Sequence, residues 1–237
     1  MNEEDRNKFY ILLDSLTIYA NDLLHVSDRL LSGDPEMISP IEQAHVCQEI
    51  WSDHKFLIDD FASDPDNRLM PDEIEMLRHW NKSLTGDFLA MERSDRTMFL
   101  IAHGYAFAVT GIAAEIGDII PDTPIVVSST LVPFGDAIVY VGYLVESPDV
   151  FDRPTQREAL ALLDDCVEKG HVVTTAADFE RVVDELSQNE VQSELDAMMD
   201  EFGSDLSKTP NKGCTRGPLA GLESDERDEL DRKAEDA

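Results

Sequence analysis

Apolar residues recur at three- and four-residue steps through the first third of the chain, which is the spacing of one face of an α-helix. The pattern predicts a long helix over residues 4–32, a second over 40–62 and a third over 71–80. Gly33 and Pro35 end the first helix, because glycine accepts the left-handed cap conformation and proline cannot continue the helical hydrogen bonds. Each helix has one apolar face, so each needs a surface to pack against.

The hydrophobic period changes to a strand pattern after Gly86. Five short runs rich in β-branched and aromatic residues follow, separated by polar or glycine-containing turns. The strongest turn signal is Pro133-Phe134-Gly135-Asp136, between the fourth and fifth runs. The runs predict a five-stranded antiparallel sheet, with a curled, barrel-like form as an alternative. They are 88–92, 98–102, 105–112, 124–132 and 137–145.

Helical patterning returns after the sheet. Residues 154–169 predict a helix that ends at Gly170, and residues 176–201 predict another that Thr175 caps. The residues between these helices fit a short strand or a linker. From residue 204 onward the apolar periodicity is lost, and this predicts a disordered tail.

Together these elements predict an α+β fold. An N-terminal helical region, 1–85, packs on the antiparallel β-sheet region, 86–146, and the two share one core. C-terminal helices occupy 147–203, and a tail with acidic and basic residues occupies 204–237. The chain has 237 residues, of which 42% are hydrophobic, so it can bury a sizeable core.

The formal net charge of −31 is the largest compositional signal. Residues 1–85 carry −11, 86–150 carry −7, 151–203 carry −10 and 204–237 carry −3, so the charge is not gathered in an acidic tail. A surface of this sign repels nucleic-acid phosphates and anionic membranes, and we expect neither as a partner. The ordinary interpretation is a solvated acidic surface shared by a whole proteome. The alternative is a surface selected to bind a basic partner or to imitate DNA.

The cysteines and the N-terminus predict a cytoplasmic protein. Cys47, Cys166 and Cys214 are an odd number with wide spacing, which fits reduced thiols better than a disulfide framework. The first residues are acidic where a secretion signal is basic and then apolar. No apolar stretch in the sequence is long enough to span a bilayer.

No residue set in the sequence commits the chain to a reaction. His45, Cys47 and His54 come nearest to a metal site, but His45 points away from the other two and Cys47 belongs to an apolar helix face. Acidic pairs are numerous, without an apolar context that would raise a carboxyl pKa for acid–base work. We therefore predict no cofactor and no metal, and we assign no catalytic residue.

The aromatic residues divide into core and candidate surface positions. Trp51 and Trp80 lie on apolar helix faces, so we expect both in the core. Tyr140 and Tyr143 are three apart on a predicted strand and should point to opposite faces. With Phe134 at the turn, they form the predicted partner-binding edge. The alternative is a sheet edge with ordinary aromatic content.

One stretch of the chain resembles a family of uncharacterised bacterial proteins. The family pattern is G-x-F followed by a hairpin reading LLPF-x-(D/G)-x-I-x-Y-x-G. The matching residues here are Trp80, 86–88, 105–111 and 130–142, within about residues 77–146. An aspartate often stands in the family where this chain has Val141. The resemblance implies paired strands around a turn, and it implies no activity.

Three functions remain open at this point. The first is a non-enzymatic binding or regulatory protein with a protein partner, which the lack of convergent polar groups and the sheet-edge aromatics favour. The second is an enzyme with a carboxylate-based site in a cleft between sheet and helices, which requires two buried carboxyl groups facing one pocket. The third is an acidic inhibitor that mimics DNA, which requires rows of carboxylates at phosphate-like spacing.

Overall fold

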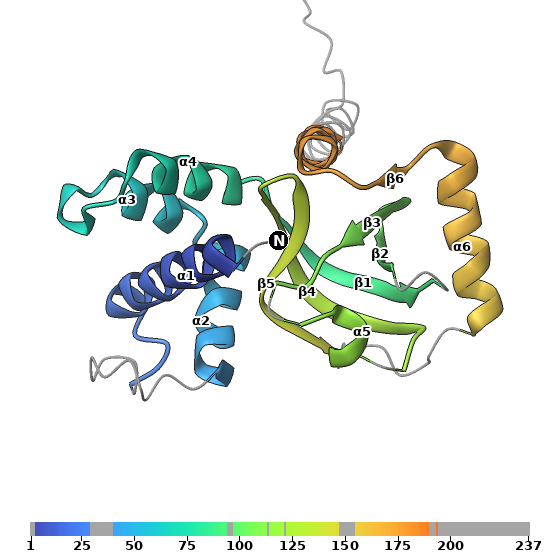
Figure 1. Ribbon diagram of the computed structural model, residues 1–237, viewed down its shortest axis with the longest axis horizontal. Coiled ribbons are helices and arrows are strands. Elements are labelled where there is room, and N and C mark those ends of the chain that lie inside the picture. The colour runs from blue at the N-terminus through green and yellow to red at the C-terminus, as the bar shows by residue number, and fades with distance from the viewer. Residues whose placement is uncertain are drawn as a thin grey trace, which may run out of the picture. The chain divides into compact units, whose positions relative to one another are not determined.

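The computed structural model describes residues 3–28, 40–93, 97–112, 114–120, 122–146, 155–189 and 193 (Figure 1). Residues Met1–Glu190 belong to one compact unit. All helices and strands given below belong to this unit. The predicted tail, 204–237, and the end of the predicted helix 176–201 lie outside the described residues.

The described N-terminal residues form four α-helices and one turn of 3-10 helix. These are α1 (Glu3–Leu24), α2 (Pro40–Asp53), α3 (Phe56–Ser63), η3 (Pro65–Asn67) and α4 (Pro71–Trp80). The predicted extent of the first helix is wrong, because α1 ends at Leu24. The buried Asn21 side chain bonds both the N–H and the carbonyl of Ser27, and His25 takes a left-handed φ of 54°. The predicted helix 40–62 is also wrong as one piece, since it is interrupted between α2 and α3.

All five predicted strands are confirmed, and they close into a barrel. They are β1 (Leu84–Glu92), β2 (Met98–Ala102), β3 (Tyr105–Val109), β4 (Ile125–Phe134) and β5 (Ala137–Glu146). The pairs β1–β2, β2–β3, β1–β4 and β4–β5 are antiparallel. The ring is completed by β3 and β5, which pair in parallel at Val109 and Ile138. The barrel is therefore mixed, where a purely antiparallel sheet was expected.

The connectivity explains why two strands of the barrel, β3 and β5, pair in parallel. Strands β1, β2 and β3 follow one another as a meander, and β4 returns beside β1 in a Greek-key arrangement. The short helix α5 (Ile116–Ile119) lies between β3 and β4. A five-stranded Greek-key barrel is the arrangement of the OB-fold, which is partly open. Here the free edge of β3 is filled by β6 (Val172–Val173), which pairs with Ala106 and Phe107.

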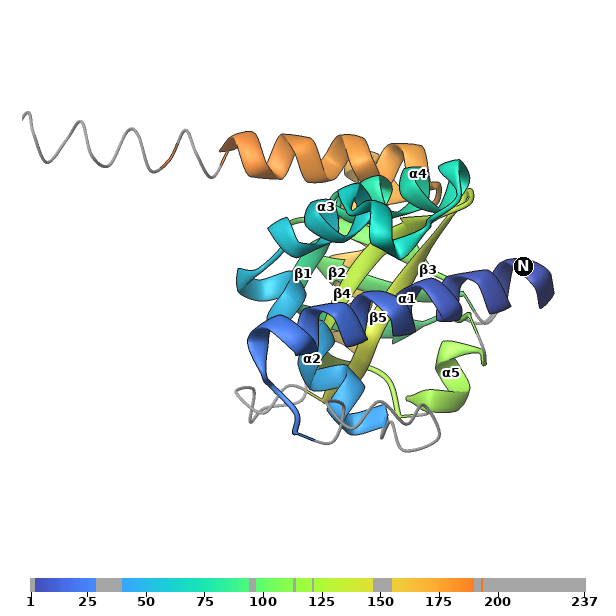
Figure 2. The same cartoon turned by 90° about the vertical axis from the view of Figure 1, so that its left-hand side faces the viewer.

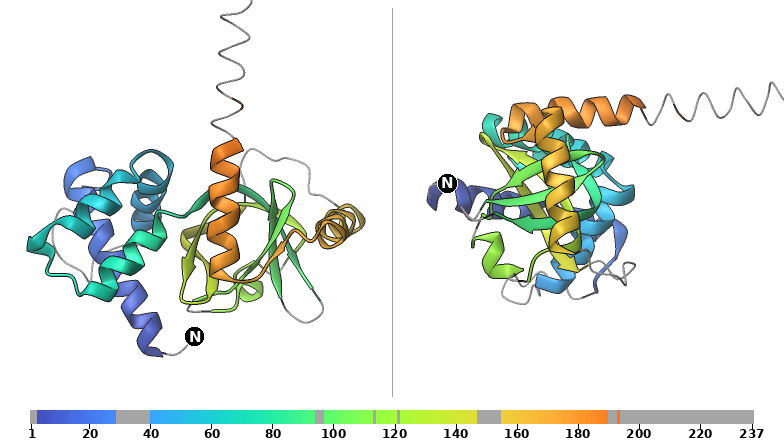
Figure 3. Two further views of the ribbon diagram at one scale, coloured as in Figure 1. Left: turned by 90° about the horizontal axis from the view of Figure 1, so that it is seen from above. Right: turned by 90° about the vertical axis from the view of Figure 1, so that its right-hand side faces the viewer.

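Side-chain alternation on the strands separates three apolar clusters. The barrel interior holds one cluster, which includes Phe88, Leu100, Phe107, Val127 and Ile138. The outward faces of β4 and β5 join the N-terminal helices in a second cluster through Val132, Phe134, Val139 and Val141. The outward faces of β1, β2 and β3 join a third cluster with the C-terminal helix α6 (Gln156–Lys169). Figure 2 shows the N-terminal helices in front of the strands, and Figure 3 shows α6 on the side of β1–β3.

Both predicted ends of α6 and the predicted start of the helix that follows it are confirmed. Thr155 caps α6 by accepting a hydrogen bond from the Glu158 N–H, and Gly170 ends the helix at φ 72°. A further helix over 176–189 starts after Thr175, whose hydroxyl accepts from the Asp178 N–H. This helix sends Phe179, Val182 and Val183 into the barrel cluster, so it plugs one end of the barrel. Among the described helices, none combines the length and apolarity needed to cross a bilayer.

A candidate binding groove at the β4–β5 hairpin

The tip of the β4–β5 hairpin is the best-defined candidate site. Gly135 sits at the turn with φ 59°, a conformation that glycine adopts without steric cost. The Asp136 carbonyl accepts a 3.1 Å hydrogen bond from the Ala176 N–H. The hairpin tip is therefore tied to the start of helix 176–189, 40 residues later in the sequence (176 − 136).

Two adjoining cavities open around this tip, and together they form what we call the hairpin groove. One has a volume of about 350 Å³ and the other about 570 Å³, within the size range of ligand sites in proteins. They share the hairpin residues Phe134, Gly135 and Asp136 and the α4 residues Asp72 and Met76. The remaining wall residues come from α1, α4 and helix 176–189; they are Asp5, Lys8, Glu75, His79, Ala176, Ala177 and Glu180, with Pro133, Ala137 and Thr110 from the barrel.

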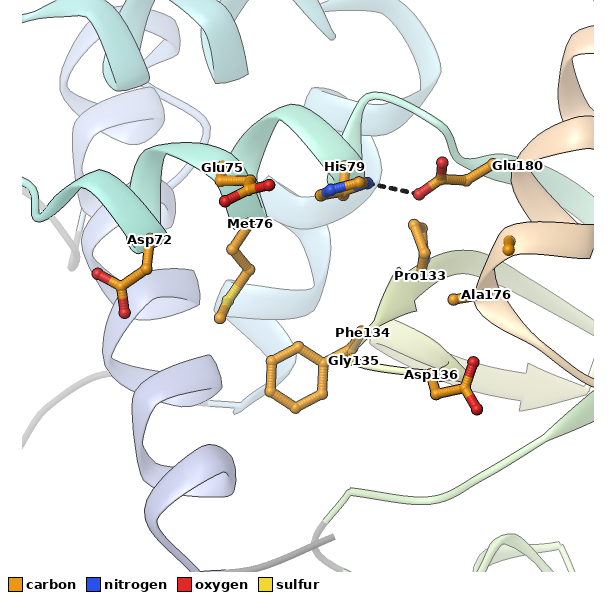
Figure 4. Close-up of a pocket in the computed structure, with 11 residues that line it drawn as sticks. Asp72, Glu75, Met76, His79, Pro133, Phe134, Gly135, Asp136, Ala176 and Glu180 are labelled. Carbon is orange, nitrogen blue, oxygen red and sulfur yellow. Dashed lines mark hydrogen bonds and ion pairs between the residues drawn. The ribbon is translucent and has the colours of Figure 1, made fainter.

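The floor of the hairpin groove is apolar and rests on the main core. The Phe134 side chain is only 7% exposed, and its ring centroid lies 5.0 Å from that of Phe9 on α1. Met76 is partly buried and packs against the same cluster. Figure 4 shows Met76 reaching from α4 toward the Phe134 ring. The floor is thus held by the packing of two helices and the hairpin.

Two contacts between side chains join the walls of the groove. Lys8 on α1 donates to Asp72 on α4, and this bond lowers the pKa of the Asp72 carboxyl and raises that of Lys8. His79 Nδ1 on α4 lies 2.5 Å from Glu180 Oε1 on helix 176–189 (Figure 4). A third pair, Lys82–Asp184, joins the turn after α4 to helix 176–189 beyond the groove. The walls are therefore linked to one another before any ligand arrives.

The other two acidic residues of the rim, Glu75 and Asp136, take no part in these contacts. Glu75 on α4 and Asp136 at the hairpin are both exposed. Within the described residues, neither carboxylate has a hydrogen bond or an ion pair. Figure 4 places them on two sides of the floor formed by Met76 and Phe134. The groove can therefore offer two unoccupied negative charges above an apolar surface.

The structure brings one of the three predicted partner-binding residues to this groove. Phe134 lines it, as a nearly buried floor residue. Tyr140 is half-buried and packs against the barrel cluster, and burial raises the pKa of its hydroxyl. The backbone of Tyr143 lies in β5, and its side chain is outside the description. The expected two-residue alternation does not apply between the tyrosines, because the register shifts there: Thr130 pairs with Val141 and Ser129 with Leu144.

Sequence reasoning missed the α4 wall of the groove. Asp72, Glu75, Met76 and His79 are spaced by three and four residues, which puts them on one helical face. The sequence contains that spacing, but by itself it indicates only a solvated helix surface. The fold is needed to show that the hairpin and helix 176–189 lie opposite this face. The residues of helix 176–189 carry no sequence link to α4. Only the barrel connectivity brings them together.

The other candidate groups do not form a site. Cys47 is buried between α1 and β5, and burial raises the pKa of its thiol to about 12. His54 Nδ1 lies 3.2 Å from the Glu49 carbonyl oxygen. In the described ranges no three histidine, cysteine or acidic side chains are grouped so as to hold a metal ion. Trp51 and Trp80 are confirmed as core residues, at 1% and 0% exposure.

Comparison of the chain with protein-family models, with curated proteins and with solved structures found no match. The similarity of the hairpin to a bacterial family pattern therefore stays a prediction.

Proposed function

We propose that this protein is a non-enzymatic binding module that takes a segment of a protein partner in the hairpin groove. The observation that carries the proposal is the groove's construction. Its walls come from α1, α4, the β4–β5 hairpin and helix 176–189, and hydrogen bonds and ion pairs join these walls. Sites that are already formed before binding lose less conformational entropy when a partner arrives.

The barrel connectivity supports the same place. OB-type barrels bind ligands with the face of their second and third strands and with the loops that join strands 1–2 and 4–5. In this chain α6 covers the outer face of β2 and β3 through Ala159, Leu163 and Cys166. The hairpin that joins β4 and β5 remains open. Together with the net charge of −31, the covered face disfavours the oligonucleotides that such barrels bind elsewhere.

The carboxylate enzyme has less support than the binding module. A catalytic acid needs a carboxyl group whose pKa is raised by burial. The groove carboxylates of Asp72, Glu75 and Asp136 are exposed, and the pKa of Asp72 is lowered. The groove therefore resembles a surface for contact more than a centre for proton transfer.

Filling the groove tests the proposal. Ala177 lines it and is exposed, so Ala177→Trp should occupy the space without disturbing the core. Ala161→Trp makes the same change at an exposed position of α6 and is the matched control. Both proteins, immobilised at equal amounts, would be exposed to lysate of the source cell and the captured proteins quantified by mass spectrometry.

We expect at least one protein to be captured by the unmodified chain and by Ala161→Trp but not by Ala177→Trp. Equal thermal melting of the two variants would show that both are folded. If both variants capture the same proteins in the same amounts as the unmodified chain, the groove is not the binding site.

A further inference from the structure

We infer that the partner segment is basic: a lysine or arginine side chain lies with its methylene groups on Met76 and Phe134 and its charged end between Glu75 and Asp136. This inference rests on the proposed function and names the chemistry of the partner. It comes from the combination of an apolar floor with charges of one sign above it.

The charge of the rim is the first part of the argument. Four acidic side chains, Asp72, Glu75, Asp136 and Glu180, line the smaller cavity. Lys8 is bonded to Asp72 and His79 to Glu180, so both basic groups of the groove are already engaged. Glu75 and Asp136 stay available among the described contacts. A neutral or acidic segment would leave both carboxylates without a partner and partly covered, which is unfavourable.

The floor is the second part of the argument. A small hydrated cation would gain nothing from Met76 and Phe134, whereas lysine and arginine carry an apolar stem that packs on such a surface while the charged end stays at the rim. Phe134 also offers an aromatic ring to the groove, and a cation near such a ring is attracted by its negative face.

The acidity of the whole chain makes a matched control necessary. Any basic peptide is attracted to a protein of net charge −31, so loss of two charges anywhere weakens binding somewhat. Specific recognition requires that Glu75 and Asp136 matter more than two equally exposed carboxylates elsewhere. Asp164 and Glu168, both exposed on α6, provide that comparison.

The experiment measures fluorescence anisotropy of a labelled, capped nonapeptide that alternates lysine and serine, with the full-length protein. The control peptide has every lysine acetylated, which keeps the stem and removes the charge. The protein variants are Glu75→Gln/Asp136→Asn, Asp164→Asn/Glu168→Gln and Ala177→Trp. We expect the groove double variant to weaken binding by about tenfold or more, because the lysine side chain loses both carboxylates that it contacts. We expect a similar loss for Ala177→Trp, because its side chain fills the groove. We expect the α6 double variant to weaken binding by less than about threefold, because exposed charges outside the site act only through screened attraction.

The possible results distinguish a failure of the inferred basic partner from a failure of the groove as the binding site. If the acetylated peptide binds as tightly as the lysine peptide and Ala177→Trp abolishes both, the groove binds a segment but the inference of a basic partner is overturned. If neither peptide binds at low salt, the inference is overturned as well. If both double variants weaken binding equally and Ala177→Trp has no effect, the attraction is diffuse and the groove is not the site. Displacement of the peptide by spermidine at an equal concentration would overturn the assignment to a protein segment.

Discussion

The barrel carries two helical covers, and they differ in how much each contributes to the core. Over β4 and β5, the N-terminal helices bury Trp51 and Trp80 in a cluster of twenty side chains that includes the strand residues. Over β1, β2 and β3, α6 contributes Ala159, Leu163 and Cys166, and leaves Leu160, Leu162 and Val167 exposed. One cover is therefore part of the main core, and the other is a single amphipathic helix.

The difference indicates which parts of the molecule can open. Local opening costs least where few apolar contacts are buried, so α6 can separate from the barrel at a lower free energy than the N-terminal helices can. The hairpin groove lies at the edge of the N-terminal cover and takes its floor from that core through Phe134 and Phe9. A rigid floor suits recognition of a partner by a preformed site.

Truncation of Trp80 in the N-terminal helices should cause the largest loss of stability. Trp80 is fully buried, with its ring centroid 4.9 Å from that of Phe9 and 6.3 Å from that of Trp51. Trp80→Ala should lower the free energy of unfolding by about 3–5 kcal/mol, because a large cavity remains. Urea titration followed by far-UV circular dichroism measures it. Leu162→Ala on the exposed side of α6 should change stability by less than about 0.5 kcal/mol; similar losses for both would contradict the comparison of the covers.

The contact between the N-terminal cover and the barrel should not tolerate one added methyl group at Gly142. Gly142 in β5 has φ 71°, and a Cβ there would lie 2.5 Å from Cys47 Cβ on α2. Gly142→Ala should cost about 2–4 kcal/mol, from the left-handed backbone and from overpacking. Gly104 has φ 77° with open space around it, so Gly104→Ala should cost only the backbone part, about 1–2 kcal/mol. Chemical denaturation of both variants separates the two contributions, and equal costs would mean that the helix yields at Cys47.

The covers also show what the sequence could and could not predict. Strand alternation and turn residues located all five strands, because each depends on neighbours within a few residues. The interruption at His54 was missed because the apolar stripe continues on the same side through Trp51 and Ile58, which are both buried. The early end of α1 depends on a bond from Asn21 to Ser27, and asparagine in a helix gives no sign of that role.

The candidate site was less predictable than the fold. The turn at Gly135 and Asp136 was recognised, and Phe134 was named as the aromatic residue at the turn of a partner-binding edge, whereas its side chain is nearly buried. The opposite wall is supplied by α4 and helix 176–189, which lie about 60 residues before and 40 residues after the hairpin. The pairing of β1 with β4 brings α4 to the hairpin, and the pairing of β6 with β3 leads into helix 176–189. No local sequence pattern encodes these pairings.

A substitution that weakens the packing of α6 on the barrel tests the second of the two covers. Leu163 is 4% exposed in the small third cluster. Leu163→Ala should cost about 2 kcal/mol, near the lower end for a buried leucine, because the helix can detach instead of holding a cavity. Hydrogen exchange should accelerate in 156–169 while the amides of β4 and β5 stay protected. Faster exchange throughout the barrel would show that α6 belongs to the main core after all.

The smallest predicted effect tests how tightly the N-terminal cover excludes water. Burial raises the pKa of Cys47 from 9.0 to about 12, so the folded protein keeps this proton over a range in which the unfolded chain loses it. Because the folded state then binds more protons, its stability is fully present below pH 9 and falls between pH 9 and about 12. By pH 10 the loss from this group should be about 1 kcal/mol.

Other groups titrate in the same range, so the quantity to measure is the difference in unfolding free energy between the unmodified protein and Cys47→Ala. That difference should shrink from pH 8 to pH 10, and iodoacetamide should leave Cys47 unmodified until the protein unfolds. Parallel stability curves, with rapid alkylation of Cys47 in the folded protein, would mean that the contact between α2 and the barrel admits solvent.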